Sequence, residues 1–257
     1  MLRVAALLAS LLFCASSGAQ AGTILVSGDV NIGNGIDGSF GVPIGNNGVF
    51  FRNVLGAGTS VLFQTGFSDG SAGLAYTSIA SLYSGLPGVT ETTITTAPTA
   101  AQLTGVSLFL SALPLTPYSA ANLSVLASYL ASGGTVFFLG DNNSVADLIT
   151  ADNNINAALG ALGSSVSLAL NNLDVGFQTA VGGQILANAL TVGVNSFVYS
   201  AVSGVAGGTA LFNTLEGTPF VAVTTTQTAS VPESGSFAFI VAGLLGLGFA
   251  HRRRGRR

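Results

Sequence analysis

The sequence has very little charge, and its positive charge is almost confined to its two ends. Only 7% of the 257 residues are charged, and all seven basic residues are arginines. Arg52 is the only one of them between residues 22 and 231, a stretch that holds nine of the ten acidic residues. An acidic, lysine-free body repels phosphate backbones, so nucleic acid is excluded as an expected partner.

Cysteine and histidine each occur once, and both lie outside this stretch. Cys14 falls in the N-terminal segment and His251 near the C-terminus. Without a thiol or an imidazole, the body has no means of forming a disulfide, a cysteine nucleophile, a Ser-His-Asp triad or a zinc site with nitrogen and sulfur ligands. We therefore expect no catalytic residue of these kinds, no metal and no cofactor.

Residues 1–21 have the pattern of a secretory signal peptide. Arg3 supplies a short positive region, and an uncharged apolar run follows over residues 4–13. Ala19 and Ala21 then form a small-x-small cleavage site. The alternative is a buried N-terminal helix. With a signal peptide, signal peptidase and the secretion machinery are partners, and residues 22–226 are the exported body.

The C-terminal segment, residues 227–257, joins an apolar stretch to a basic cluster. Residues 235–250 carry no charge, and as a helix they would extend about 24 Å, slightly less than the bilayer core of about 30 Å. Basic residues beside such a helix stay on the cytoplasmic side. We expect a transmembrane helix over 235–250 and a stop-transfer tail over 251–257, whereas a buried helix or a nucleic-acid-binding arm are the alternatives. The stop-transfer residues are Arg252, Arg253, Arg254, Arg256 and Arg257.

A short motif stands directly before the apolar stretch. It consists of Val231, Pro232, Glu233 and Ser234. Together with the apolar stretch and the arginine cluster, it resembles the PEP-CTERM sorting signal, in which the motif is Val-Pro-Glu-Pro; Ser234 departs from that pattern. The resemblance implies cleavage near the motif by an exosortase and delivery to the surface or the extracellular polysaccharide matrix of a Gram-negative bacterium. Pro232 also disfavours helix, which keeps this segment extended and accessible.

Apolar runs alternate with helical patterns along the body. This alternation predicts an α/β fold, with a doubly wound, mostly parallel sheet and helices on both faces. The later runs at 196–199, 209–212 and 220–224 either complete the sheet or add an antiparallel edge, and an all-β sandwich or solenoid is the competing fold. We predict strands at 23–27, 60–64, 106–110 and 135–139, and helices at 50–55, 75–86, 117–132 and 144–162.

One part of this pattern has a more specific likeness. Residues 126–141 read Leu-x-x-Tyr-Leu-x-x-Gly-Gly-x-Val-x-x-Leu-Gly-Asp, which resembles the class I glutamine-amidotransferase-like superfamily. That resemblance implies a flavodoxin-like body. Enzymes of the superfamily use a cysteine and a histidine, and the body has neither, so amidotransfer from glutamine is excluded.

Two polar turns follow predicted strands, and we expect them to meet at the carboxyl edge of the sheet, where such folds bind ligands. Asp29 and Asn31 lie in the first turn, and Asp141 and Asn142 in the second. The two carboxyls leave a paired-carboxylate glycosidase open, although turn formation or helix capping explains them more simply. Residues 29–38 alternate oxygen-bearing side chains but do not match a calcium-binding EF-hand loop.

These observations predict an exported surface or matrix protein that an exosortase sorts and cleaves. The body is expected to be non-catalytic, with extracellular polysaccharide as a candidate ligand. Two alternatives stay open. One is a carbohydrate-active hydrolase that uses Asp29 and Asp141, and the other is an unprocessed membrane protein anchored by its C-terminal helix.

Overall fold

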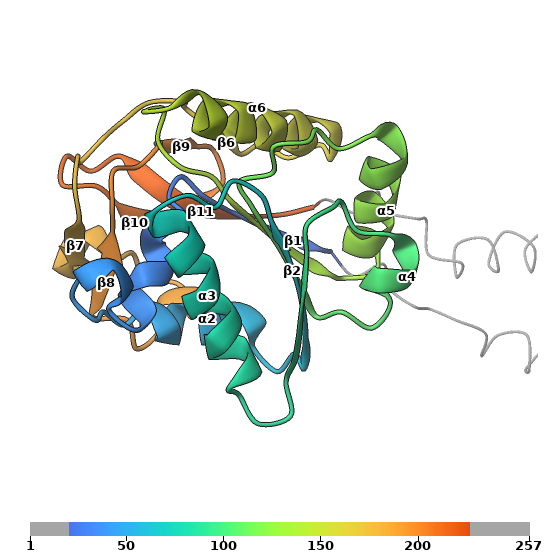
Figure 1. The fold of residues 1–257 in the computed structure, drawn as a ribbon, viewed down its shortest axis with the longest axis horizontal. Helices are drawn as coiled ribbons and strands as arrows, with labels where there is room; N and C mark the ends of the chain where they lie inside the picture. Colours follow the sequence, from blue (N-terminus) through green and yellow to red (C-terminus); the bar gives the residue numbers. More distant parts are fainter. Residues whose placement is uncertain (1–20, 227–257) are drawn as a thin grey trace, which may run out of the picture. The chain divides into compact units, whose positions relative to one another are not determined.

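A seven-stranded sheet runs through the body in the computed structural model, which describes residues 21–226 (Figure 1). Its strand order is β10-β11-β1-β5-β4-β2-β3. The five strands from β1 to β3 in this order are parallel. In contrast, β11 pairs antiparallel with β1, and β10 pairs antiparallel with β11. The strands are β1 (Thr23–Ser27), β2 (Ser60–Thr65), β3 (Thr90–Ile94), β4 (Leu108–Ala112), β5 (Thr135–Leu139), β10 (Thr209–Asn213) and β11 (Pro219–Thr225).

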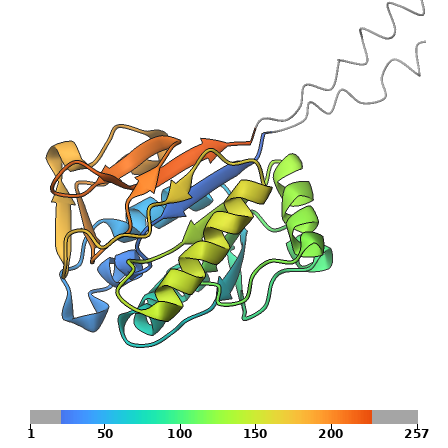
Figure 2. The ribbon, with the colours of Figure 1, turned by 90° about the horizontal axis from the view of Figure 1, so that it is seen from above.

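Helices cover both faces of the sheet (Figures 1 and 2). One face packs against α2 (Asn47–Leu55) and α3 (Ser71–Ser84), whose aromatic residues join the first hydrophobic core. The other face packs against α4 (Ala100–Leu103), α5 (Ala120–Ala131) and α6 (Ala146–Ala161), which supply the second core. The α/β class, the mostly parallel sheet and the antiparallel edge of the prediction are therefore confirmed.

The remaining described elements are short. Two small antiparallel pairs and four 3-10 turns lie outside the main sheet. The pairs are β6 (Ser167–Leu168) with β9 (Val205–Ala206), and β7 (Gln178–Val181) with β8 (Ser196–Tyr199). The turns are η1 (Asn31–Ile36), η2 (Ser39–Gly41), η3 (Gly182–Gln184) and η4 (Ala189–Thr191).

A cluster of phenylalanines connects these additions to the sheet. The Phe50 ring of α2 makes edge-to-face contacts with Phe137 of β5, Phe197 of β8 and Phe212 of β10. Phe197 and Phe212 stack at 3.8 Å between ring centroids. Such contacts add to the free energy gained from burying the rings, so β7 and β8 are part of the first core.

The predicted element boundaries were partly wrong. The strands at 23–27 and 135–139 are confirmed, but the predicted 106–110 strand begins at Leu108. The helix predicted from residue 117 begins at Ala120, because Ser119 rather than Thr116 accepts the capping hydrogen bond from the Asn122 amide at 3.2 Å. The helix predicted from residue 144 begins at Ala146 without a side-chain cap. The 196–199 run pairs with β7 instead of joining the sheet.

Several predicted features lie outside the described residues. They are residues 1–20 of the predicted signal peptide, which include Ala19, and, near the C-terminus, the motif of residues 231–234, the apolar stretch 235–250 and the tail 251–257. Within residues 21–226, no helix is both long enough and apolar enough to cross a membrane.

Candidate functional site

The two predicted turns lie side by side at the carboxyl ends of β1 and β5, which are neighbouring parallel strands. Asn31 Nδ2 of the first turn donates a hydrogen bond to Asp141 Oδ2 of the second at 3.1 Å. All four predicted residues are buried, and Asp29 and Asp141 are only 0% and 2% exposed. The sheet therefore brings the predicted turns together, as expected, but inside the body.

Asp29 uses both carboxyl oxygens to hold backbone. Its Oδ1 accepts from the Asn31 amide at 2.7 Å, which shapes the turn after β1. Its Oδ2 accepts from the Ser200 amide at 2.6 Å, which fixes the chain just after β8. Through these two hydrogen bonds, Asp29 joins β1 to a segment far along the chain.

Asp141 and Asn142 shape the turn after β5 in a similar way. Asp141 Oδ1 accepts from the Asn142 amide at 2.7 Å and from Asn142 Nδ2 at 2.6 Å. Asn142 Oδ1 in turn accepts from the Ser144 amide at 2.8 Å, and its Nδ2 reaches the Ala201 carbonyl at 3.2 Å. Both side chains are thus occupied by neighbouring groups of the same protein.

A third carboxyl completes the network and was not predicted. Asp152 of α6 is 1% exposed; its Oδ1 accepts from the Asp141 amide at 3.0 Å and its Oδ2 from Ser203 Oγ at 3.2 Å. A sequence signal for its burial exists, because Asp152 stands four residues after Leu148 and three before Ile155, on the apolar face of the predicted helix. We refer to Asp29, Asp141 and Asp152 as the acidic network.

Burial governs the protonation of the acidic network. It raises the pKa of Asp29 to about 7 and that of Asp152 also to about 7. Burial raises the pKa of Asp141 well above its ordinary value as well, and the nearby Asp29 carboxyl raises it further. Arg52, the one basic residue of residues 22–226, lies exposed on α2, so no cation of the described body neutralises these groups. We conclude that the network retains protons near neutral pH.

The arrangement suits a structural role. A glycosidase needs carboxyls that reach the scissile bond of a sugar, whereas the carboxyl oxygens of Asp29 and Asp141 are enclosed and already accept hydrogen bonds. Residues 29–38 do not form a calcium loop either: Asn31–Ile36 is a 3-10 turn. In the described part of the chain, no group of three or more His, Cys, Asp or Glu side chains is placed to hold a metal ion.

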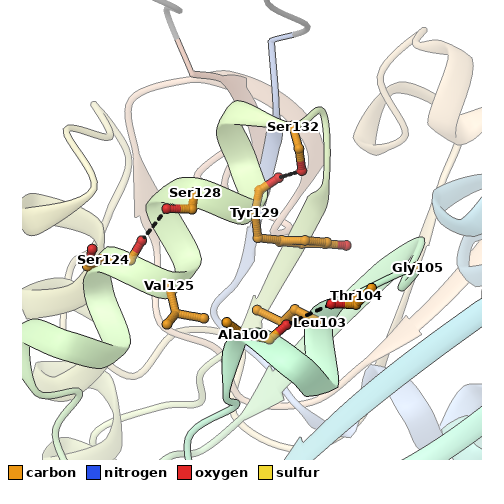
Figure 3. A pocket seen from close by; sticks show the side chains of 9 residues that line it. All are labelled: Ala100, Leu103, Thr104, Gly105, Ser124, Val125, Ser128, Tyr129 and Ser132. Atoms are coloured by element: carbon orange, nitrogen blue, oxygen red, sulfur yellow. Dashed lines mark hydrogen bonds between the residues drawn. The ribbon is translucent and has the colours of Figure 1, made fainter.

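A groove between α4 and α5 is a separate feature that the sequence did not predict (Figure 3). Its volume is about 320 Å³, and its lining has no charged residue. Leu103 and Tyr129 form an apolar floor, and burial raises the pKa of Tyr129 to about 12. Ser128 Oγ donates to the Ser124 carbonyl at 2.9 Å and Ser132 Oγ to the Tyr129 carbonyl at 2.7 Å, so these hydroxyls are directed into their own helix.

The chain was also compared with known proteins. No protein-family model matches it, and no curated protein matches it. Among solved structures, the mmIFT52 N-terminal domain is similar, with a TM-score of 0.44 and 19% sequence identity over 60% of this chain and 72% of that chain. At this level of similarity, the match defines neither a family nor a function.

Proposed function

We propose that the chain is an exported surface or extracellular-matrix protein of a Gram-negative bacterium. Its C-terminal segment is the sorting signal that an exosortase recognises and cleaves, and its body is non-catalytic and binds extracellular polysaccharide. The observation that carries this proposal is the order of three features at the C-terminus: the motif of residues 231–234, the apolar stretch 235–250 and five arginines.

The physical basis of sorting is a balance of hydrophobic and electrostatic effects. The uncharged stretch partitions into the bilayer, and the arginines resist transfer across it. The N-terminal signal has meanwhile directed the body to the outside. The motif is then held at the outward face of the inner membrane, where a processing enzyme reaches it.

The way in which the body ends supports this arrangement. The Thr226 amide donates to the Gly22 carbonyl at 2.9 Å, and the Gly22 amide donates to Thr226 Oγ1 at 3.0 Å. These hydrogen bonds close the β1–β11 pair at the end of the sheet. Val231, where the motif begins, follows Thr226 by no more than about 18 Å of extended chain. Cleavage there leaves every hydrogen bond of the sheet in place.

The non-catalytic assignment of the body rests on its side-chain chemistry. Residues 22–226 have no cysteine or histidine, and the acidic network is enclosed and hydrogen-bonded. With a single arginine, the body also lacks the cationic surface that binds phosphates. A neutral polysaccharide is the matrix component that such a surface suits.

Fractionation of cells with and without the exosortase tests the proposal. We expect the protein to leave the inner membrane only where the enzyme is present, and the Ser234→Pro variant, which restores the second proline, to be processed faster. Replacing the five terminal arginines by glutamine should impair retention at the membrane, whereas Arg52→Gln is the matched control and should be sorted normally. Sorting that is unaffected by the loss of all five arginines would contradict the proposal.

The departure at Ser234 favours one second candidate, a protein that stays anchored by residues 235–250. In that case the protein would remain in the inner membrane of both strains at equal amounts. Ser234→Pro would then convert it into a processed protein.

A further inference from the structure

The turn η2, which follows β1 and η1, exposes an aromatic ring in a strained backbone. Phe40 has φ 60° and ψ 15°, and its side chain is 55% exposed. Gly38 and Gly41 on either side also have positive φ, which glycine adopts freely and phenylalanine does not. Backbone strain of this kind clusters at sites that contact another molecule.

The ring of Phe40 has a support on one side. Phe177, which is half-buried just before β7, lies 5.8 Å away between ring centroids with the two planes at 44°. The contact restrains Phe40 while more than half of its side chain stays in solvent. A ring that is held in this way loses little conformational freedom when a ligand stacks on it.

Hydrogen-bonding groups are fixed in the same turn. The exposed Asp37 carboxylate accepts from the Ser39 amide at 3.0 Å and from Ser78 Oγ at 2.9 Å. Ser39 Oγ donates to Asn34 Oδ1 at 2.8 Å and lies 3.0 Å from Ser78 Oγ; because a hydroxyl oxygen has two lone pairs, it keeps one position for an outside donor. A carboxylate accepts about four hydrogen bonds, so Asp37 retains capacity for hydroxyl groups from outside.

We propose that η2 is a binding site for a neutral polysaccharide, with the Phe40 ring against the C–H face of a sugar and Asp37 and Ser39 accepting from its hydroxyls. This inference rests on the proposed function and assigns its ligand contact to one surface. The turn lies beyond the carboxyl end of β1, the edge at which open α/β sheets bind ligands. An anionic polymer is disfavoured, because Asp37 is negative and the one arginine of the body lies on α2.

The groove between α4 and α5 is the other candidate surface, and two observations disfavour it. The Tyr129 side chain in that groove is 7% exposed against 55% for Phe40, so its ring has little surface to offer a sugar. Ser128 and Ser132 in the groove also donate to carbonyls of their own helix. Phe40 therefore has the accessible ring, and Asp37 the accessible acceptor.

Binding of the purified full-length protein to cellulose and amylose, with alginate as the anionic comparison, tests the inference. We expect the unmodified protein to bind at least one of the neutral polymers and not alginate. Phe40→Asn should weaken this binding about tenfold or more, as expected for losing the burial of an aromatic ring. Asparagine tolerates left-handed backbone, so the melting temperature should not fall.

Two further variants locate the site. Val192→Asn removes an apolar side chain that is 68% exposed in the chain beside η4, and Ser128→Phe fills the groove; both should leave binding unchanged. The inference is overturned if Phe40→Asn binds as well as the unmodified protein, if Ser128→Phe abolishes binding, or if Phe40→Asn only dissociates an oligomer. Failure of the unmodified protein to bind either neutral polymer overturns both this inference and the polysaccharide role, but not the sorting, which cell fractionation tests by itself.

Discussion

Asn31 Nδ2 donates a hydrogen bond to Asp141 Oδ2 at 3.1 Å across 110 residues of sequence. The contact joins the turn after β1 to the turn after β5, in the interior of the protein. Through Asp141, it also connects β1 to α6, because the Asp141 amide donates to Asp152. The carboxyl end of the sheet is therefore closed by polar side chains whose charge state affects the stability of the fold.

The acidic network predicts that stability falls as pH rises. The pKa of Asp29 is about 7 in the folded protein against an ordinary 3.8. Between these two pH values the folded state keeps a proton that the unfolded chain releases. The free energy of unfolding is therefore highest below pH 3.8 and falls as the pH rises to about 7. The loss is about 1.4 kcal/mol per pH unit for each retained proton. Urea unfolding across this range checks it, and stability that increases toward neutral pH would contradict it.

Asp152→Asn should remove part of this pH dependence while preserving the contacts. The asparagine oxygen can accept from the Asp141 amide as the Asp152 oxygen does. The asparagine Nδ2 can donate to Ser203 Oγ, because the Ser203 hydroxyl hydrogen can turn to its other acceptor, the Asn171 carbonyl. We expect higher stability than the unmodified protein at about pH 8 and little difference at about pH 4. Urea midpoints at both pH values measure this.

Asp29→Asn is the matched control for that variant. Both oxygens of Asp29 accept from backbone amides, so an asparagine there turns an N–H group toward the amide of either Asn31 or Ser200. We expect a cost of about 1–3 kcal/mol at about pH 4, where Asp29 is protonated, and a smaller cost at about pH 8, where the substitution also removes a buried charge. Equal stability of the two variants would show that the hydrogen-bond assignment is wrong.

Asn47 should be among the most sensitive polar residues of the body. It is 0% exposed; its Nδ2 donates to the Ile32 and Val198 carbonyls, and its Oδ1 accepts from the Val198 amide. Asn47→Ala leaves three buried backbone groups without partners, so we expect a loss of about 3 kcal/mol or more. Asn53→Ala on the same helix removes bonds at a partly exposed position and should cost about 1 kcal/mol or less. Guanidinium unfolding compares the two.

Two glycine-to-alanine changes should act in opposite directions. A Cβ at Gly28 would lie 1.8 Å from the Ser203 carbonyl oxygen, so the turn after β1 must shift. A Cβ at Gly160 of α6 meets nothing within 4 Å, and alanine favours helix by about 0.5–1 kcal/mol. Thermal melting should show Gly28→Ala less stable and Gly160→Ala more stable than the unmodified protein. A stable Gly28→Ala variant would contradict the close contact between β1 and Ser203.

Central strands were predictable from the sequence because they are continuous apolar runs. β1 and β5 were found at their observed bounds, whereas β3 was missed. Its sequence, TETTI, is polar and largely exposed at the sheet edge, so it carries no burial signal. The start of α5 was misplaced because Thr116 and Ser119 both have capping hydroxyls, and only Ser119 has Asn122 three residues later to complete the capping box.

The candidate site was only half predictable for a related reason. Parallel neighbouring strands place their carboxyl ends together, which is how Asp29 and Asp141 were expected to meet. Their burial depends on the segment after β8, since Ser200 bonds to Asp29 across 171 residues of sequence. No local pattern indicates such a partner. The sequence therefore predicts an open site, whereas the structure encloses both turns.

Intact-mass measurement of the protein recovered from the cell surface or the matrix tests the central claim most directly. The account predicts a chain that begins at Gly22 and ends near Val231–Ser234, without the apolar stretch and without Arg252–Arg257. A surface protein that retains its terminal arginines would contradict it.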